Sequence, residues 1–118
     1  MSVRAVIFSA IFGSLATTAT ADFAKVENQD DFIRYVVGKT LSHPLARLKV
    51  SPDGTISGNG SWRPVTGNWT WKDGYFCRDL FWGEGALGYN CQEVRINGGR
   101  MRFTSDRGQG LSAVFRIK

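Results

Sequence analysis

Residues 65–94 read VTGNWTWKDGYFCRDLFWGEGALGYNCQEV, and this stretch decides the fold. Two turn signals, Asp73-Gly74 and Gly83-Glu84-Gly85, divide it into three runs that are rich in aromatic and apolar residues. Glycine-containing turns between runs of this kind are typical of β-hairpins. The stretch therefore predicts three consecutive antiparallel strands that are joined by two tight turns.

The turns also predict how the three strands align. If Asp73-Gly74 is a two-residue loop, Trp69 lies opposite Arg78 on the middle strand. A three-residue loop at 83–85 then places Arg78 opposite Asn90 on the third strand. Because successive side chains point to opposite faces, this alignment fixes the inner face of the middle strand. Its predicted members are Phe76, Arg78, Leu80 and Trp82, and the other predicted pairs are Lys72 with Tyr75, Trp71 with Phe76, Phe76 with Gln92, Cys77 with Cys91 and Trp82 with Ala86.

The same alignment predicts a disulfide bond between Cys77 and Cys91, on the outer face of the sheet. Directly opposed residues of two antiparallel strands are close enough to be bridged. An even cysteine count is typical of an oxidising compartment, and closing this loop is worth about 3 kcal/mol in the chain-entropy model. The alternative is a metal or redox pair, but there is no CxxC spacing, and His43 is remote in sequence.

The alignment brings polar side chains to the inner face among aromatic ones. Buried polar groups must be hydrogen-bonded or pay a large desolvation cost, so the cluster is a candidate ligand site. Alternatively, the Arg78 guanidinium packs over Trp69 near a barrel end and caps backbone carbonyls. The candidate ligand-binding residues are Trp69, Arg78, Asn90 and Gln92.

The outer face carries an apolar cluster around the disulfide: Tyr75, Phe81, Leu87 and Tyr89. An exposed cluster of this size marks a partner surface. The alternative is that the one predicted helix covers it. That helix is expected over residues 28–37, with Asn28 and Asp30 as candidate caps and Gly38 as its stop.

Turn signals at short intervals continue through the rest of residues 22–118, and apolar and polar residues alternate between them. Examples of the signals are Pro52-Asp53-Gly54, Asn97-Gly98-Gly99 and Gly108-Gln109-Gly110. Such alternation is typical of antiparallel sheets, in which one face is buried and the other is exposed to solvent. The sequence predicts a single all-β domain, a small antiparallel meander that forms a barrel or a strongly bent sheet, with one short N-terminal helix.

Residues 1–21, MSVRAVIFSAIFGSLATTATA, have the pattern of a signal peptide. Arg4 precedes an apolar run, and Ala19-Thr20-Ala21 supplies the small residues of a cleavage site. An uncleaved anchor is the alternative, but a membrane span needs about 20 apolar residues, and this run is shorter. We expect a mature chain that starts at Asp22, a periplasmic or secreted location, and no stable membrane insertion after cleavage.

Charge and motifs exclude several function classes. The whole chain has 15 Lys and Arg against 10 Asp and Glu, and these cations are not clustered in the sequence as they are in nucleic-acid readers. Ser42-His43 has no neighbouring carboxylate, so a serine nucleophile there is weakly supported. There is no metal-ligand spacing and no GxGxxG after a strand. We therefore predict no catalytic residue, no metal, no cofactor and no nucleic-acid partner.

The segments LARLKVSPDGTISGNG, residues 65–94 and RFTSDRGQGLSAVFRIK together resemble a family of small exported alphaproteobacterial proteins with no established activity. Members are often labelled dihydrodipicolinate reductase, which implies an NAD(P)H-dependent oxidoreductase. This chain departs from that enzyme in length, in compartment, and in lacking its glycine-rich dinucleotide loop and its histidine-rich stretch. Gly67-Asn68-Trp69 and the helix-plus-meander layout are more loosely similar to lipocalin-like barrels and to bacterial barrel inhibitors of secreted proteases.

These observations favour a protein that binds rather than one that catalyses. The expected partner is a small ligand or an envelope protein. The alternatives are an enzyme, as the family label implies, and a structural accessory of an envelope complex that uses the outer apolar cluster.

Overall fold

The computed structural model describes residues 22–118 as a strand-rich domain, and the predicted signal peptide lies outside the described residues. Nine strands form one antiparallel sheet in the order β1-β7-β6-β5-β4-β3-β2-β9-β8. The strands are β1 (Ala24–Lys25), β2 (Leu41–His43), β3 (Ala46–Val50), β4 (Thr55–Gly60), β5 (Arg63–Lys72), β6 (Tyr75–Trp82), β7 (Gly85–Asn97), β8 (Arg100–Thr104) and β9 (Ser112–Ile117).

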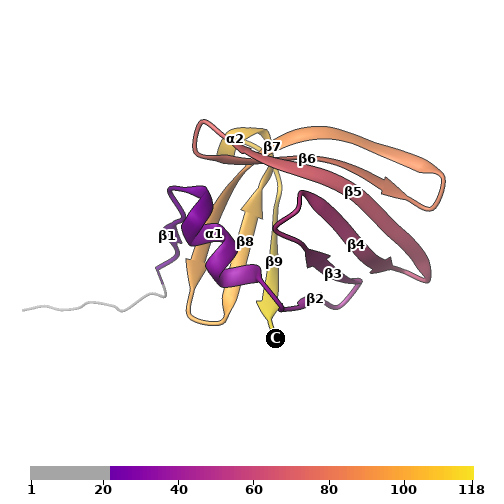
Figure 1. The fold of residues 1–118 in the computed structure, drawn as a ribbon, viewed down its shortest axis with the longest axis horizontal. Helices are drawn as coiled ribbons and strands as arrows, with labels where there is room; N and C mark the ends of the chain where they lie inside the picture. The colour runs from indigo at the N-terminus through magenta and orange to yellow at the C-terminus, as the bar shows by residue number, and fades with distance from the viewer. Residues whose placement is uncertain (1–21) are drawn as a thin grey trace, which may run out of the picture.

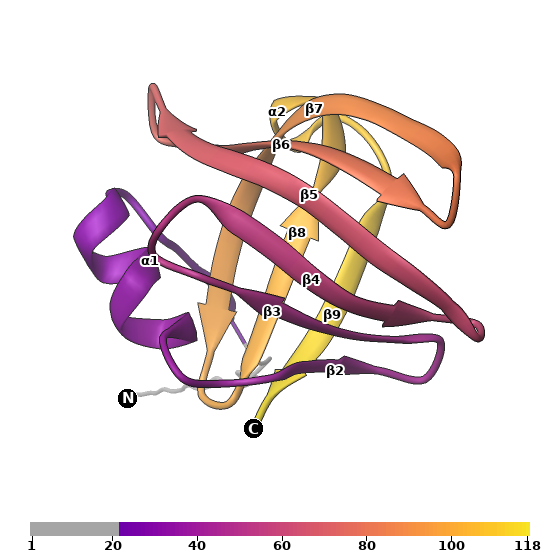
Figure 2. The same cartoon turned by 45° about the vertical axis from the view of Figure 1, so that its right-hand side comes forward.

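A long, bent β7 closes the sheet into a barrel (Figures 1 and 2). Its first part pairs with β6 as far as Gln92, opposite Phe76, and its second part pairs with β8 from Glu93 onward. Strands β2 to β9 therefore make a closed eight-stranded ring, and β1 adds to β7 where β6 has ended. The predicted all-β class is confirmed, and the barrel is closed.

The predicted N-terminal helix is present as α1 (Gln29–Val36). Its N-cap is Asn28, whose side chain accepts a hydrogen bond from the Asp31 backbone N–H at 2.9 Å. The helix covers one end of the barrel, with Phe32 and Val36 fully buried. It does not cover the outer apolar cluster: Phe81, Leu87 and Tyr89 remain 37%, 55% and 61% exposed.

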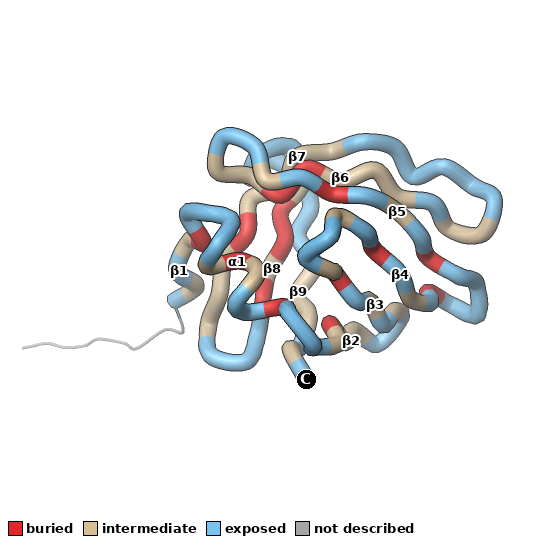
Figure 3. The backbone as a smooth tube through the Cα atoms, in the orientation of Figure 1, coloured by how far each residue is buried: buried red, intermediate tan, exposed pale blue. Residues whose placement is uncertain are grey.

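The aromatic core lies under this helix. The Phe32 ring centroid is 5.3 Å from that of Trp69, 5.2 Å from that of Trp71 and 5.0 Å from that of Phe76, with Phe103 at 6.5 Å. Edge-to-face and offset aromatic pairs at such distances add to the energy of burial. Figure 3 shows buried backbone positions beneath α1 and along β8. We call this end of the barrel the closed end.

The predicted strand register is confirmed except at one turn. Trp69 lies opposite Arg78, and Arg78 opposite Asn90. The second turn is shorter than predicted, because Trp82 pairs with Gly85 rather than with Ala86. A β-bulge between Leu80 and Phe81 absorbs the extra residue. The shorter turn and the bulge offset each other, so the residues from Phe76 to Leu80 pair with their predicted partners on β7.

Cys77 and Cys91 form the predicted disulfide, at opposed positions of β6 and β7. Cys77 is 1% exposed although it belongs to the outer face. The Tyr89 hydroxyl oxygen lies 3.6 Å from the Cys91 sulfur. The disulfide therefore links β6 to β7, and neighbouring side chains partly cover it.

Two inward-facing glycines allow neighbouring strands to approach closely. A Cβ atom on Gly67 would lie 2.2 Å from the Asp79 carbonyl oxygen, and one on Gly58 would lie 2.0 Å from the Arg47 carbonyl oxygen. Both contacts are to backbone, so a side chain could not be accommodated by rotation alone. Glycine at such bends is typical of strongly coiled small barrels.

A second helical turn, α2 (Ser105–Gly108), was not predicted. It contains Asp106 and Arg107 with φ of 55°, which is the left-handed region. It connects β8 to β9 and packs against β7, with the Arg107 guanidinium 5.2 Å from the ring centroid of Tyr75, the first residue of β6. In the described residues, no helix has the length and apolar character needed to cross a membrane.

Candidate functional site

A cavity of about 160 Å³ lies inside the barrel, away from α1. The tight turns between β2 and β3, β4 and β5, and β6 and β7 lie at this end, because alternate turns of an antiparallel barrel share an end. We call it the open end. The cavity is lined by Leu41, Leu48, Val50, Ile56, Phe76, Arg78, Leu80, Gln92, Phe103, Ala113 and Phe115.

The residues that line the cavity differ in how far they are buried. Its base is formed by residues that solvent hardly reaches, namely Leu41, Val50, Ile56, Phe76 and Phe103. Its other lining residues are half-buried, so the cavity opens away from the aromatic core. Arg78 and Gln92 supply its charged and amide side chains. An apolar hollow with a few convergent polar groups is the usual form of a small-molecule site.

Arg78 carries a permanent positive charge into this apolar hollow. Its Nη1 donates a hydrogen bond to the Gly88 carbonyl oxygen at 2.8 Å. Burial lowers the pKa of the guanidinium, and the neighbouring Asp79 carboxylate acts in the opposite direction. In the described residues the ion pairs are Arg34 with Asp31 and Arg95 with Glu93, so Arg78 forms no ion pair there.

Gln92 and Asn90, both predicted to be ligand-binding residues, have different surroundings. Gln92 lines the cavity and donates from Nε2 to the Ser105 hydroxyl at 3.2 Å. Asn90 does not line the cavity. Its Nδ2 donates to an Asp106 carboxylate oxygen at 2.7 Å, and its Oδ1 accepts from the Asp106 N–H at 2.9 Å. Asn90 therefore fixes the α2 turn beside the cavity.

Trp69, the fourth predicted site residue, belongs to the closed end. It is 4% exposed, packs against Phe32 and Phe76, and donates from Nε1 to the Ser51 carbonyl oxygen at 2.8 Å. The expected stacking of Arg78 on Trp69 is absent from the cation–aromatic contacts of the described residues. The expected capping of a carbonyl by Arg78 is present, at Gly88.

The Ser42-His43 pair has no catalytic arrangement. The two residues lie on β2, and successive side chains of a strand point to opposite faces. The His43 ring lies 5.3 Å from that of Phe115, and its Nδ1 accepts a hydrogen bond from the Leu45 N–H at 3.1 Å. No group of three or more potential metal ligands occurs within residues 22–118.

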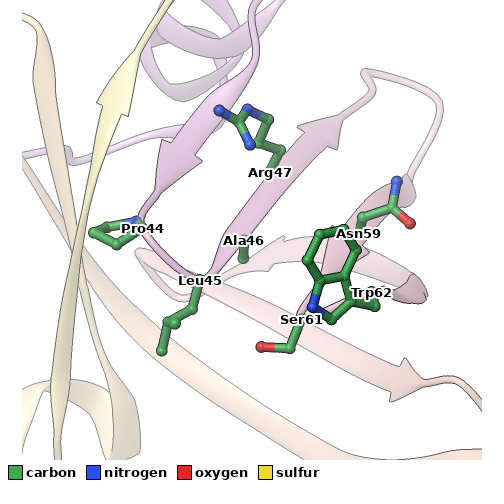
Figure 4. Close-up of a pocket in the computed structure, with 7 residues that line it drawn as sticks. All are labelled: Pro44, Leu45, Ala46, Arg47, Asn59, Ser61 and Trp62. Carbon is green, nitrogen blue, oxygen red and sulfur yellow. The ribbon is translucent and has the colours of Figure 1, made fainter.

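Sequence reasoning missed an exposed feature of the open end. Trp62 is 100% exposed in the turn between β4 and β5, where Ser61 and Trp62 have φ of 46° and 74°. Neither of these two central residues is the Gly, Asn or Asp that usually adopts positive φ, so the sequence does not predict this turn geometry. A groove of about 540 Å³ lies beside Trp62 and is lined by Pro44, Leu45, Ala46, Arg47, Asn59, Ser61 and Trp62 (Figure 4).

No protein-family model, curated protein or solved structure matches this chain. The predicted resemblance to small exported alphaproteobacterial proteins therefore remains a prediction. The geometry of the cavity is the basis for the function proposed next.

Proposed function

We propose that this protein is a binding barrel that takes a small organic acid into its open end. The observation that carries the proposal is Arg78, a half-buried cation that forms no ion pair in the described residues and lines an otherwise mostly apolar cavity. A buried charge is costly unless it is paired, so an anion that enters the cavity relieves this cost. The guanidinium fork suits a carboxylate, because it can donate two parallel hydrogen bonds.

The size of the cavity limits what it can enclose. A volume of about 160 Å³ is close to that of dry engineered cavities of about 150 Å³ that hold one benzene ring. A short acyl chain or a single ring therefore fits inside against Leu48, Ile56 and Phe115. The carboxylate of such a ligand would lie at Arg78, with Gln92 as a second donor. Larger acids would extend out of the open end.

The compartment is part of the proposal. A disulfide-bonded barrel fits an oxidising environment, which agrees with export to the periplasm or to the medium. Cleavage after Ala21 would give a chain that starts at Asp22. The intact mass of the protein from a periplasmic extract tests this directly. A full-length chain in the membrane fraction would contradict it.

Calorimetric titration with hexanoate, with hexanol as its uncharged counterpart, tests the proposed ligand class. We expect saturable binding of hexanoate and binding of hexanol that is weaker by about 10- to 100-fold, since a hydrogen bond to a charged group is worth about 1.5–3 kcal/mol. Arg78→Met should remove this preference, whereas Arg34→Met, on the surface of α1, should keep it. Equal binding of acid and alcohol to the unmodified protein would contradict the proposal.

A further inference from the structure

We propose that the outer face of strands β8, β9, β2 and β3 docks onto an anionic lipid surface. This proposal concerns the outside of the barrel and does not depend on the cavity. The outward side chains of these strands form a basic face, which we define as Arg47, Lys49, Arg100, Arg102 and Arg116.

The strand register places these cations side by side although they are far apart in sequence. Arg100 lies directly opposite Arg116, and Ser42 separates Arg116 from Arg47 across the next two strands. Neighbouring strands are about 4.8 Å apart, so three arginines span about four strands in one row. The sequence shows no cluster of like charges because the barrel, rather than the chain, brings them together.

The acidic side chain beside this face is Glu93 on the adjoining β7, which interacts with Arg102 but is hydrogen-bonded to Arg95; no ion pair involves Arg47, Arg100 or Arg116 within the described residues. The inward positions of these strands hold apolar residues such as Leu41, Met101 and Phe103. The other outward positions of β8, β9, β2, β3 and the adjoining β4 are Thr104, Ser112, Val114, Ser42, Thr55, Ser57 and Asn59. Directly opposed like charges destabilise a sheet. An anionic surface would relieve this repulsion.

The cations differ in how far their positions are fixed. Arg102 is half-buried, with its guanidinium 4.5 Å from the Phe23 ring centroid, and Lys49 donates to the Thr40 hydroxyl at 3.1 Å. Arg47, Arg100 and Arg116 are exposed, and no hydrogen bond or ion pair holds their side chains within residues 22–118. These three are therefore free to contact phosphate groups.

Two exposed apolar side chains border the same face. The groove that contains Arg47 and Asn59, both outward residues, is flanked by Leu45 and Trp62 (Figure 4). Leu45 is 66% exposed and Trp62 is 100% exposed. Tryptophan is enriched where membranes meet water, because its ring is apolar and its N–H is polar. Stable attachment to a membrane usually needs two such signals, one electrostatic and one apolar.

The chemistry of the face favours a lipid surface over a nucleic acid. Single-stranded nucleic acids are bound by basic grooves in which aromatic rings stack on the bases. Apart from Val114, the outward residues between these arginines are small and polar. Of the aromatic rings at this surface, Phe23 is already engaged by the Arg102 guanidinium, and Trp62 projects from a hairpin tip at the border. A lipid surface offers an array of phosphates and an apolar layer beneath it, which matches both sets of side chains.

Co-sedimentation with vesicles tests the proposal. The full chain, in the processed form that the cell delivers, is mixed with vesicles of phosphatidylcholine alone or of equimolar phosphatidylcholine and phosphatidylglycerol. We expect binding to the anionic vesicles only, weakening as salt is added. The double variant Arg100→Gln, Arg116→Gln should lower the partition coefficient by about 30-fold, since each surface cation is worth about fivefold. The matched control, Arg34→Gln with Lys72→Gln, removes the same charge elsewhere and should bind more tightly than the face variant.

All variants have the same N-terminal residues, so these residues cannot cause a difference in vesicle binding between the variants. Such a difference therefore comes from the substituted side chains. Trp62→Ala should also weaken binding to anionic vesicles, and circular dichroism verifies that each variant is folded. Equal loss in the face variant and its control would overturn the proposal, as would equal binding to both kinds of vesicle. Tight binding of soluble heparin without vesicle binding would overturn it in favour of a soluble polyanion.

Discussion

The two ends of the barrel are built from the same kinds of residue but are packed differently. At the closed end, Phe32 from α1 fills the interior among Trp69, Trp71 and Phe76, and polar groups such as the Trp69 N–H are paired. At the open end, no helix fills the interior, a cavity remains, and Arg78 enters it without forming an ion pair in the described residues.

The difference teaches where stability and binding capacity reside in a small domain. A chain of this size buries a modest core, so most of its stability must come from the regions that are fully packed. The open end contributes fewer contacts and leaves a charge to be satisfied. We infer that the closed end and the disulfide hold the barrel together, and that the open end is available to a ligand.

The largest expected effect is at the closed end. Phe32→Ala removes the ring on which four other aromatic rings converge, and it should cost about 3–5 kcal/mol of unfolding free energy. Phe115→Ala, which enlarges a cavity that is already present, should cost about 1–2 kcal/mol. Urea denaturation measures both. Equal costs would show that the two ends are packed alike.

The disulfide is expected to have the next largest effect. Replacing Cys77 and Cys91 together by serine should lower the unfolding free energy by about 2–4 kcal/mol, because the unfolded chain regains the freedom of a short loop. The far-ultraviolet spectrum should keep its β signature. Titration of the unfolded, unreduced native protein should find no free thiol, and two free thiols would refute the pairing.

Two substitutions that enlarge a side chain next to Phe103 compare the filled side of the interior with the side that holds the cavity. Val94 and Ala113 lie opposite Phe103 on its two neighbouring strands, and only Ala113 lines the cavity. Val94→Ile should cost about 1–3 kcal/mol because this position is 0% exposed and already filled. Ala113→Val should be neutral or stabilise by up to about 1.5 kcal/mol. It should also weaken hexanoate binding. A destabilising Ala113→Val with unchanged binding would contradict the assignment of the cavity.

The smallest expected effect is a pH dependence where β7 passes from β6 to β8. Hydrogen bonds from the Arg95 side chain lower the pKa of Glu93 below its usual value. The ionised form is therefore favoured by folding, and its contribution is present at neutral pH and lost as the pH falls below about 4. Unfolding of the native protein and of Glu93→Gln, compared at neutral and acidic pH, should show a difference that shrinks in acid. A difference that grows in acid would contradict the sign.

Local patterns were sufficient to predict much of the fold. The Asp73-Gly74 turn fixed the register of β5 and β6, and the caps at Asn28 and Gly38 bounded α1. The closure of β7 on β8 and the position of α1 could not be predicted, because both depend on packing between distant segments. The bulge near Leu80 was also missed, because it leaves the alternation of the strand below it unchanged.

The candidate site was predicted in part for the same reason. The register correctly placed Arg78 and Gln92 inside, since alternation along a strand determines which face a residue occupies. It could not reveal that Trp69 bonds to Ser51 and that Asn90 bonds to Asp106, because these partners come from loops whose path is set by the whole barrel. Trp62 carried no signal, because its turn lacks the residues that favour positive φ.

The most direct test of the central claim is a titration of isotope-labelled protein with hexanoate, followed by nuclear magnetic resonance. We expect saturable shifts at Arg78, Gln92 and Ala113, which line the cavity, and unchanged signals from α1 at the closed end. The Arg78→Met variant should lose these shifts while its spectrum remains that of a folded barrel. Shifts confined to α1 or to the outer face, or an equal response in the variant, would contradict binding at the open end.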